Sequence, residues 1–204
     1  MSNLNKMKSI IIEKTLKLDC GKEISHFPLA YETYGNLNEK KDNAILIFHA
    51  LTGDQYASGI NPITKKEGWW NYAVGSGKSF DTDKFFVICA NVIGGCMGSY
   101  GPGTIDPLTN KPIGTNFPVI TINDMVNAQY NLLDYLKIEK LFAVAGGSMG
   151  GMQVLQFVSN FPNKARVALP IACTASHSAQ NIAFNELGRQ AIMSDTNWKD
   201  GLYD

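Results

Sequence analysis

The segment that most constrains the fold of this chain lies at residues 141–160, with the sequence LFAVAGGSMGGMQVLQFVSN. A short apolar run leads into a glycine-rich turn around Ser148, and apolar residues at helical spacing follow until Pro162. In the pattern G-x-S-x-G, Gly146 and Gly150 lack the Cβ atoms that would collide in a tight strand-to-helix turn. The segment is therefore typical of a strand–turn–helix unit that presents Ser148 as a nucleophile. A glycine-rich turn with an incidental serine is the alternative.

Further apolar runs predict a mainly parallel sheet with flanking helices. Strands buried on both faces are expected at 44–48, 85–90, 141–145 and 165–172. Residues 9–18 and 27–34 predict an antiparallel pair at one edge of the sheet. Thr121 and Asp124 have the spacing of a capping box, which predicts a helix that begins at this point. Buried strands that alternate with helices indicate an α/β fold, and no linker divides residues 1–204.

The composition is that of one soluble globular domain, since 45% of the 204 residues are hydrophobic and 18% are charged. Lys+Arg and Asp+Glu both number 18, so neither nucleic acid nor an anionic membrane surface is an expected partner. The sequence shows no signal-peptide pattern in its first 25 residues and no apolar run of membrane-spanning length. Because the four cysteines form no C-x-x-C pair, we expect no metal site and a cytoplasmic location.

Two loops are expected to lie beside Ser148. Parallel α/β sheets bind ligands at the carboxyl ends of their strands, and residues 49–54 and 91–96 both leave strands at that edge. The backbone N–H of Met149, at the start of the helix, points to where a carbonyl oxygen would become negative. A second N–H near Leu51 would complete this oxyanion hole.

Other features of these loops have functional interpretations that we do not favour. His49 ends a strand at the start of residues 49–54, called the oxyanion loop below. We therefore expect His49 to fix that loop by hydrogen bonding and not to act as the catalytic base. Residues 94–98 lack both G-x-G-x-x-G and the Walker lysine, which argues against a site that cradles nucleotide phosphates. The stretch 93–118 is rich in glycine and proline, and a loop of that length is usually functional.

Five sequence blocks together resemble the homoserine O-acyltransferase family of the α/β-hydrolase fold. They are HALTGD (49–54), NVIGGCMGSYGP (91–102), FPVITINDMVNAQ (117–129), AGGSMGGMQVLQF (145–157) and FNELGRQAI (184–192). The resemblance extends over nearly the whole chain. Their order and spacing are far more specific than G-x-S-x-G, which esterases, lipases and thioesterases share.

The resemblance implies that an acetyl or succinyl group passes from coenzyme A to Ser148 and then to the hydroxyl of L-homoserine, an entry step to methionine. It implies that Leu51 and Met149 provide the oxyanion amides and that Arg189 contacts homoserine. A guanidinium can bind a carboxylate with two hydrogen bonds, although Arg189 could also be a surface residue of an amphipathic helix. Acyl-coenzyme A is then a co-substrate, no bound cofactor is expected, and the full-length enzyme is expected to be a homodimer.

The chain departs from the family pattern because it lacks a recognisable acid and base. In this fold the triad partners follow in the order serine, acid, histidine, and the only histidine after Ser148 is His177, directly after the strand at 165–172. Three aspartates of the polar tail are not expected to be the triad acid: Asp195, Asp200 and Asp204.

We therefore expect residues 1–204 to form a partial α/β-hydrolase domain that stops before the helical lid and the last strands. Residues from about 178 onward would lead towards that lid. The isolated chain is expected to be inactive, without an imidazole near Ser148 and with an open apolar edge at 165–172. An ester or thioester hydrolase and a non-catalytic remnant are the alternative functions.

Overall fold

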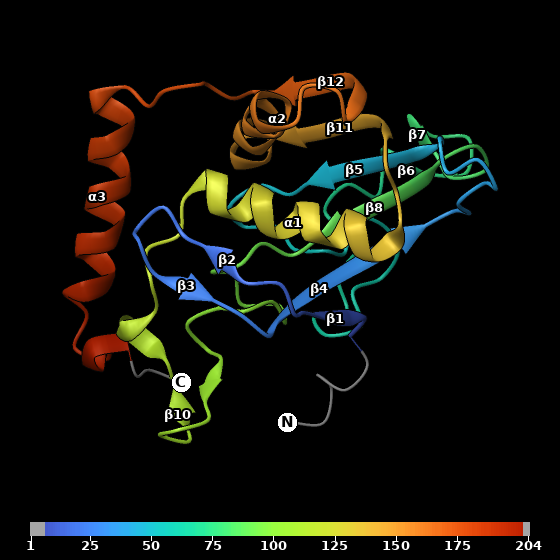
Figure 1. Cartoon of the computed structure of the whole chain (residues 1–204). Coiled ribbons are helices and arrows are strands. Elements are labelled where there is room, and N and C mark those ends of the chain that lie inside the picture. The colour runs from blue at the N-terminus through green and yellow to red at the C-terminus, as the bar shows by residue number, and fades with distance from the viewer. Residues whose placement is uncertain (1–6, 202–204) are drawn as a thin grey trace.

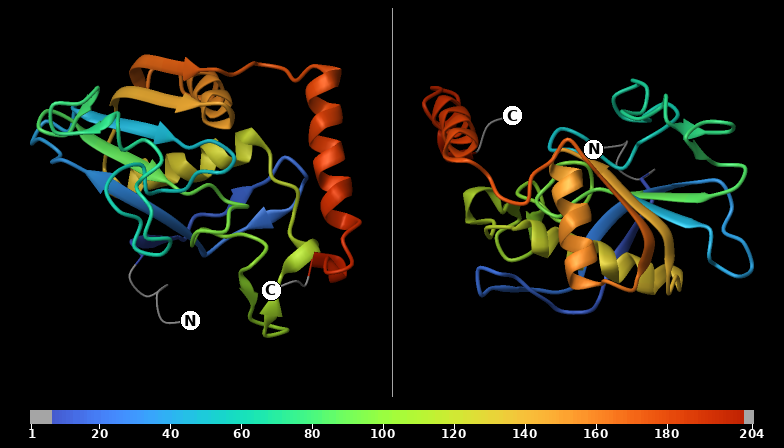
Figure 2. Two further views of the ribbon diagram at one scale, coloured as in Figure 1. Left: turned by 180° about the vertical axis from the view of Figure 1, so that it is seen from behind. Right: turned by 90° about the horizontal axis from the view of Figure 1, so that it is seen from above.

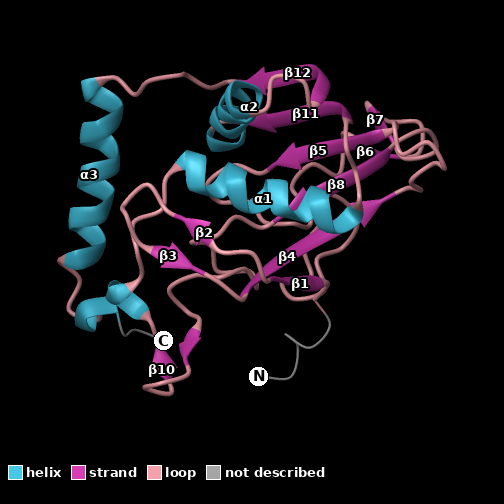
Figure 3. Ribbon diagram, viewed as in Figure 1, coloured by secondary structure: helices cyan, strands magenta, loops and turns pink. Residues whose placement is uncertain are grey.

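A six-stranded sheet forms the centre of the computed structural model, which describes residues 7–201 (Figure 1, Figure 3). In spatial order its strands are β1 (Ser9–Ile12), β4 (Phe27–Tyr34), β8 (Phe86–Ala90), β5 (Ala44–Phe48), β11 (Leu141–Gly147) and β12 (Ala165–Ile171). The pairs β1–β4 and β4–β8 are antiparallel, whereas β8–β5, β5–β11 and β11–β12 are parallel. The predicted parallel sheet with an antiparallel edge pair is confirmed.

The prediction of one strand over 9–18 is wrong, because the chain leaves the sheet after β1. Exposed polar residues at 13–15 separate β1 from β2 (Leu16–Lys17), which pairs with β3 (Glu23–Ile24) in a separate hairpin. Two further pairs of short strands lie in the long loops. They are β6 (Val74–Gly75) with β7 (Phe80–Asp81), and β9 (Ile105–Asp106) with β10 (Lys111–Pro112).

The sheet divides the core into two apolar clusters. Leu46 and Phe48 of β5 face α1 (Ile122–Leu136) and α2 (Met149–Asn160), which cover one side of the sheet (Figure 2). Ile45 and Ile47 face the opposite side, where residues 57–80 cover them. Both faces of β5 are therefore buried, which explains its uninterrupted apolar sequence.

The predicted capping box at the start of α1 is confirmed. Thr121 Oγ1 accepts a hydrogen bond from the Asp124 N–H at 3.2 Å, and Asp124 Oδ2 accepts one from the Thr121 N–H at 2.9 Å. The Asp124 carboxylate is fully buried, but it also accepts from the Asp19 N–H, so its desolvation is compensated. This cap holds the start of α1 beside the loop 93–118, which includes the short helix η2 (Gly114–Asn116).

The last part of the described chain lies largely outside the core. β12 is an edge strand, and α3 (Ala179–Met193) has no buried residue and stands apart from the sheet in Figures 1 and 2. The short helix η3 (Lys199–Gly201) follows α3 and lies against η2. The expected open apolar edge is confirmed, whereas the prediction that 165–172 is buried on both faces is wrong, because no described element covers its outer side. Within residues 7–201, no helix is both long and apolar enough for a membrane span.

Candidate active site

Ser148 occupies a sharp turn between β11 and α2. Its backbone angles are φ 56° and ψ −121°, a strained conformation for a residue with a side chain. A Cβ at Gly150 would lie 2.1 Å from the Phe48 carbonyl oxygen, and one at Gly146 would lie 2.5 Å from the Gly150 backbone. The backbones of β5, β11 and α2 thus meet too closely for any side chain, so the G-x-S-x-G spacing has the mechanical cause expected from the sequence.

The amides of Leu51 and Met149 belong to two elements that meet beside this turn. Met149 begins α2, and Leu51 lies in a turn closed by a 2.9 Å hydrogen bond from the Gly53 N–H to the Ala50 carbonyl. Among residues 7–201 neither amide donates a hydrogen bond, so both N–H groups are available to a ligand. Two free N–H groups next to a nucleophile can stabilise an oxyanion.

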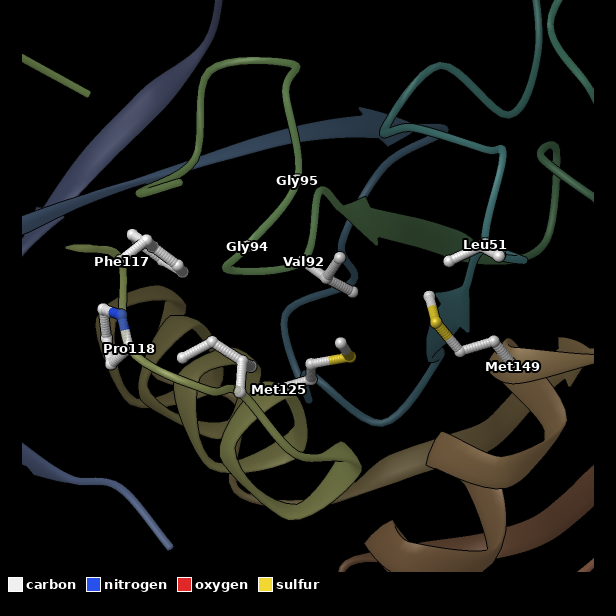
Figure 4. A pocket seen from close by; sticks show the side chains of 9 residues that line it. Leu51, Val92, Gly94, Gly95, Phe117, Pro118, Met125 and Met149 are labelled. Carbon is white, nitrogen blue, oxygen red and sulfur yellow. The ribbon is translucent and has the colours of Figure 1, made fainter. Parts of the chain in front are cut away.

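The side chains of Leu51 and Met149 line one mainly apolar pocket of about 280 Å³ (Figure 4). Val92 and Gly94 of the loop after β8 form another part of its wall. The remaining lining residues are Gly95, Phe117, Pro118, Ile120 and Met125. The loops that the sequence predicts to converge on Ser148 therefore do so, and the long loop 93–118 contributes to the site.

His49 fixes the oxyanion loop, as expected. Its Nε2 accepts a hydrogen bond from the Val92 N–H at 3.1 Å, and its Nδ1 lies 2.7 Å from the Ala50 carbonyl oxygen. Since an amide can only donate and a carbonyl can only accept, the proton is on Nδ1. Both nitrogens are occupied and the ring is 1% exposed, so His49 is not placed to act as the base for Ser148.

Two buried glutamines extend this hydrogen-bond network and were missed in the sequence. Gln129 Nε2 of α1 donates to Gln153 Oε1 of α2 at 2.7 Å, and Gln153 Nε2 makes long contacts of 3.5 Å with the carbonyl oxygens of His49 and Met149. Both side chains are fully buried. Each glutamine lies on the apolar stripe of its helix, four residues before Leu133 and Phe157 respectively, and this polar interruption is the signal that could have identified them.

Burial of His49 predicts a dependence of stability on pH. Desolvation holds the pKa of the imidazole below its ordinary value, so the unfolded chain takes up a proton near pH 6.5 while the folded chain resists it. The free energy of unfolding should therefore fall as the pH drops below about 6.5, by up to about 1.4 kcal/mol per pH unit, and level off below the folded pKa. Urea unfolding at several pH values measures this slope.

The matched comparison for this prediction is between His49→Gln and His26→Asn. His26 is exposed at a positive φ of 51°, a conformation that asparagine tolerates, so this variant should fold normally and provides the reference slope. His49→Gln should remove most of the slope. An unchanged slope in His49→Gln would contradict the assignment of the effect to His49.

No acid or base joins Ser148 within residues 7–201. The Ser148 side chain is exposed, and none of the hydrogen bonds in the described part of the chain links its Oγ to an imidazole. His177 is exposed on the connection between β12 and α3, and Asp195 and Asp200 are exposed after α3. Asp204 lies outside the described residues. Within residues 7–201, Ser148 therefore lies beside the Leu51 and Met149 amides without a proton acceptor for its hydroxyl.

Arg189 is likewise not at the pocket. It lies on α3, where its guanidinium pairs with Glu186 one turn earlier, and its side chain is 67% exposed. Across residues 7–201, no group of three or more His, Cys, Asp and Glu side chains could hold a metal ion. The structure thus brings Leu51 and Met149 to Ser148 but leaves Arg189 apart from them.

Comparison with known proteins places this geometry in a family. A family model of the α/β-hydrolase fold matches residues 43–204. This range includes the turn at Ser148, called the elbow below, the oxyanion loop and the loop after β8. The chain belongs to the α/β-hydrolase fold family. Two features of that fold are present in the described residues: the order of the strands in the sheet and the strained turn at Ser148.

Named relatives within this family include acyltransferases. The chain is 78% identical to the homoserine O-acetyltransferase of Pelagibacter ubique (strain HTCC1062) over 98% of its own length and 54% of that protein. It is 59% identical to that of Nitrobacter hamburgensis over 94% of its length and 48% of that protein. The chain therefore spans about half the length of the curated relatives it matches.

Solved structures show the same relationship. The crystal structure of homoserine O-acetyltransferase from Bacillus anthracis matches with a TM-score of 0.84 and 31% identity, over 97% of this chain and 55% of that chain. The crystal structure of esterase E22 matches with a TM-score of 0.87 and 34% identity, over 98% of this chain and 56% of that chain. Both an acyltransferase and an esterase are thus similar to this chain in fold and sequence.

Proposed function

We propose that Ser148 is the nucleophile of a homoserine O-acetyltransferase, which moves an acetyl group from coenzyme A to the hydroxyl of L-homoserine in methionine biosynthesis. The observation that carries this proposal is the strained turn at Ser148, beside which the Leu51 and Met149 amides donate no hydrogen bond within residues 7–201. The similarity to relatives named homoserine O-acetyltransferase supports the substrates and favours acetyl over succinyl. Four free cysteines fit a cytoplasmic location.

The proposed reaction has two half-reactions through one covalent intermediate. Ser148 Oγ attacks the thioester carbonyl and gives its proton to a general base, while the carbonyl oxygen becomes negative and accepts hydrogen bonds from Leu51 and Met149. The C–S bond then breaks, and the base returns its proton to the leaving sulfur, so that coenzyme A departs as the thiol. In the second half-reaction the homoserine hydroxyl attacks the acetyl-serine ester, and Ser148 recovers its proton.

The proposed reaction needs a general base and an acid that orients it. Residues 7–201 place neither group at Ser148. Without a base the serine stays protonated and is a weak nucleophile, so the chain by itself should transfer acetyl groups no faster than background. We propose that both groups come from polypeptide corresponding to the part of the relatives that this chain does not span. We also propose that the full-length enzyme is a homodimer.

A chimera tests the function directly. The chain would be joined in frame to the unmatched part of the Pelagibacter ubique relative and mixed with acetyl-coenzyme A in a rapid-quench apparatus. Peptide mass spectrometry should find the acetyl group on Ser148, and L-homoserine should discharge it to O-acetylhomoserine. A functional transfer reaction without a detectable acetyl-serine would contradict the proposal.

The similarity to esterase E22 favours hydrolysis as the second candidate function. The two functions differ in the fate of the acetyl-serine, because a hydrolase passes the acetyl group to water. In the chimera, acetate release from acetyl-coenzyme A should be slow without homoserine, and homoserine should accelerate release of coenzyme A. Acetate production at the same rate with and without homoserine would identify a hydrolase.

Arg189 is proposed to bind the homoserine carboxylate. Lysine at this position keeps the charge but loses the paired hydrogen bonds of the guanidinium, so Arg189→Lys should weaken transfer to homoserine by about 1–3 kcal/mol. Acetylation of Ser148 should be nearly unchanged, because homoserine takes no part in it. Separate measurement of the two half-reactions in the chimera gives both values.

Glu186→Gln is the matched control for this variant. It removes the carboxylate that pairs with Arg189 in α3 but keeps the guanidinium, so it should leave transfer to homoserine intact. An equal loss of both half-reactions in Arg189→Lys would indicate a structural role for the arginine instead.

A further inference from the structure

The two amides beside Ser148 each share a peptide group with a carbonyl. The Leu51 N–H belongs to the same peptide as the Ala50 carbonyl. The Met149 N–H belongs to the same peptide as the Ser148 carbonyl. Both peptide bonds are trans, so each N–H points away from the carbonyl of its own peptide. A group that donates to the carbonyl therefore lies behind the amide, as seen from the ligand that the amide faces.

Two donors lie behind the Leu51 amide. His49 Nδ1 donates to the Ala50 carbonyl oxygen at 2.7 Å, and the Gly53 N–H donates to the same oxygen at 2.9 Å. These two contacts match the two lone pairs of a carbonyl oxygen. Hydrogen bonds in a chain polarise one another, so both contacts make the Leu51 N–H more positive. The effect is strongest away from water, and the His49 ring is buried.

The imidazole ring of His49 is itself polarised from its other side. The Val92 N–H donates to His49 Nε2 at 3.1 Å, and Val92 lines the pocket together with Leu51 (Figure 4). The hydrogen bonds therefore all run in one direction, from the Val92 amide through the ring and the Ala50 carbonyl to the Leu51 N–H. A proton on Nε2 would point at the Val92 N–H, and burial also lowers the pKa of the imidazole. The ring is thus held neutral, with its proton on Nδ1.

The Met149 amide has a different group behind it. The Ser148 carbonyl accepts a hydrogen bond from the Met152 N–H at 3.1 Å, which is an ordinary bond of the first turn of α2. An amide at a helix N-terminus is already polarised by the aligned peptides of the helix. Leu51 lies in a turn and not at a helix end. The buried imidazole is therefore placed to supply to the Leu51 amide what α2 supplies to Met149.

We propose that His49 is a positioning residue, which polarises the Leu51 N–H and aims it at the oxyanion formed during acyl transfer. Its Nδ1–H acts through the Ala50 carbonyl, so the imidazole assists the reaction without touching the substrate. The inference deepens the proposed function, because it rests on an oxyanion that develops beside Ser148. It goes beyond a role in loop stability, for which activity would simply follow stability.

Two substitutions of His49 each keep one of its two ring hydrogen bonds. The side-chain nitrogen of asparagine is as many bonds from Cβ as Nδ1, so His49→Asn keeps a donor for Ala50. The side-chain oxygen of glutamine is as many bonds from Cβ as Nε2, so His49→Gln keeps only an acceptor for Val92. Because polarisation is worth less than a whole donor, we expect His49→Gln to slow both half-reactions of the chimera about tenfold and His49→Asn less than about threefold.

Stability should change in the opposite order. His49→Asn leaves the buried Val92 N–H without its acceptor, whereas in His49→Gln the Ala50 carbonyl keeps the Gly53 N–H. The melting temperature of the chimera should therefore be lower for His49→Asn than for His49→Gln. If His49→Asn were both the less stable and the less active variant, a purely structural role would explain the data and the inference would fail.

Leu51→Pro removes the amide on which His49 is proposed to act. Leu51 is the second residue of the turn closed by the Gly53–Ala50 hydrogen bond, and neither Leu51 nor Thr52 has a positive φ, so proline suits this position. The variant should lose transfer by about 10²–10³-fold. In that background His49→Gln should cost no more than about twofold, since the N–H that it affects is gone. Losses that multiply independently would contradict the inference.

Nuclear magnetic resonance of the 204-residue chain tests the hydrogen bonds without catalysis. Imidazole nitrogen spectra should show the His49 proton on Nδ1, and the Leu51 amide nitrogen should shift upfield more in His49→Gln than in His49→Asn. A ring protonated on Nε2, or an unmoved Leu51 resonance in His49→Gln, would overturn the inference. A chimera that never acetylates Ser148, although the chain gives the expected spectra, would refute the proposed function and leave the polarisation of Leu51 by His49 in place.

Discussion

Replacement of Ser148 by alanine is expected to lower acetyl transfer by about 10⁴-fold or more, since Ser148 is the proposed carrier of the acyl intermediate. The fold should be unaffected. Alanine keeps the Cβ that already tolerates φ 56°, and the exposed serine hydroxyl makes no hydrogen bond in the described part of the chain. Initial rates in the chimera measure the loss, and thermal melting of the variant checks the fold.

Kinetics of the unmodified chimera provide the matching positive result. Because the proposed mechanism leaves the acetyl group on Ser148 between the two substrates, double-reciprocal plots should be parallel, as in a ping-pong mechanism. Ser159→Ala is a suitable control, since Ser159 is exposed near the other end of α2. Intersecting plots, or substantial transfer by Ser148→Ala, would refute the covalent mechanism.

Replacement of Gly150 by valine is expected to disrupt the elbow itself. Its Cβ would lie 2.1 Å from the Phe48 carbonyl oxygen and 3.0 Å from that of His49. Phe48 is completely buried in the centre of the sheet, so α2 would have to move away from the oxyanion loop. We expect a loss of about 3 kcal/mol or more in the free energy of unfolding, measured by urea denaturation, and no residual transfer in the chimera.

Two smaller substitutions distinguish the steric overlap at position 150 from a general effect of replacing a glycine. Gly150→Ala adds only the colliding Cβ and should already be strongly destabilising. Gly147→Ala is its matched control, because a Cβ at Gly147 meets no atom within 4 Å although the residue lies in the same turn. Equal stability of the two variants would show that the close approach to β5 is not what requires glycine at position 150.

Local features of the chain could be predicted well from the sequence. The elbow at Ser148 depends on glycines two residues away, and the cap at Thr121 depends on Asp124 three residues later. Each is decided by contacts along a few residues of backbone. The buried strand Ala44–Phe48 was equally predictable, because the same five residues supply the apolar groups for both faces of the sheet.

Features that depend on partners far along the chain could not be predicted in this way. The His49–Gln153–Gln129 network joins the oxyanion loop, α2 and α1. No local sequence pattern predicts that the two glutamine side chains contact each other and the His49 carbonyl. β12 shows the reverse case. Its sequence has the composition of a buried strand, whereas its exposure depends on whether another segment pairs beside it.

The sequence by itself determined the strand–turn–helix at Ser148, the helix cap and the alternation of buried strands with helices, because these follow from steric limits and periodicity over short distances. Only the tertiary structure decided that Leu51 and Met149 line one pocket, that both nitrogens of His49 are engaged, and that Arg189 stands apart on α3. Those outcomes depend on how separate strands are ordered in the sheet, and that order arises from packing across the whole chain.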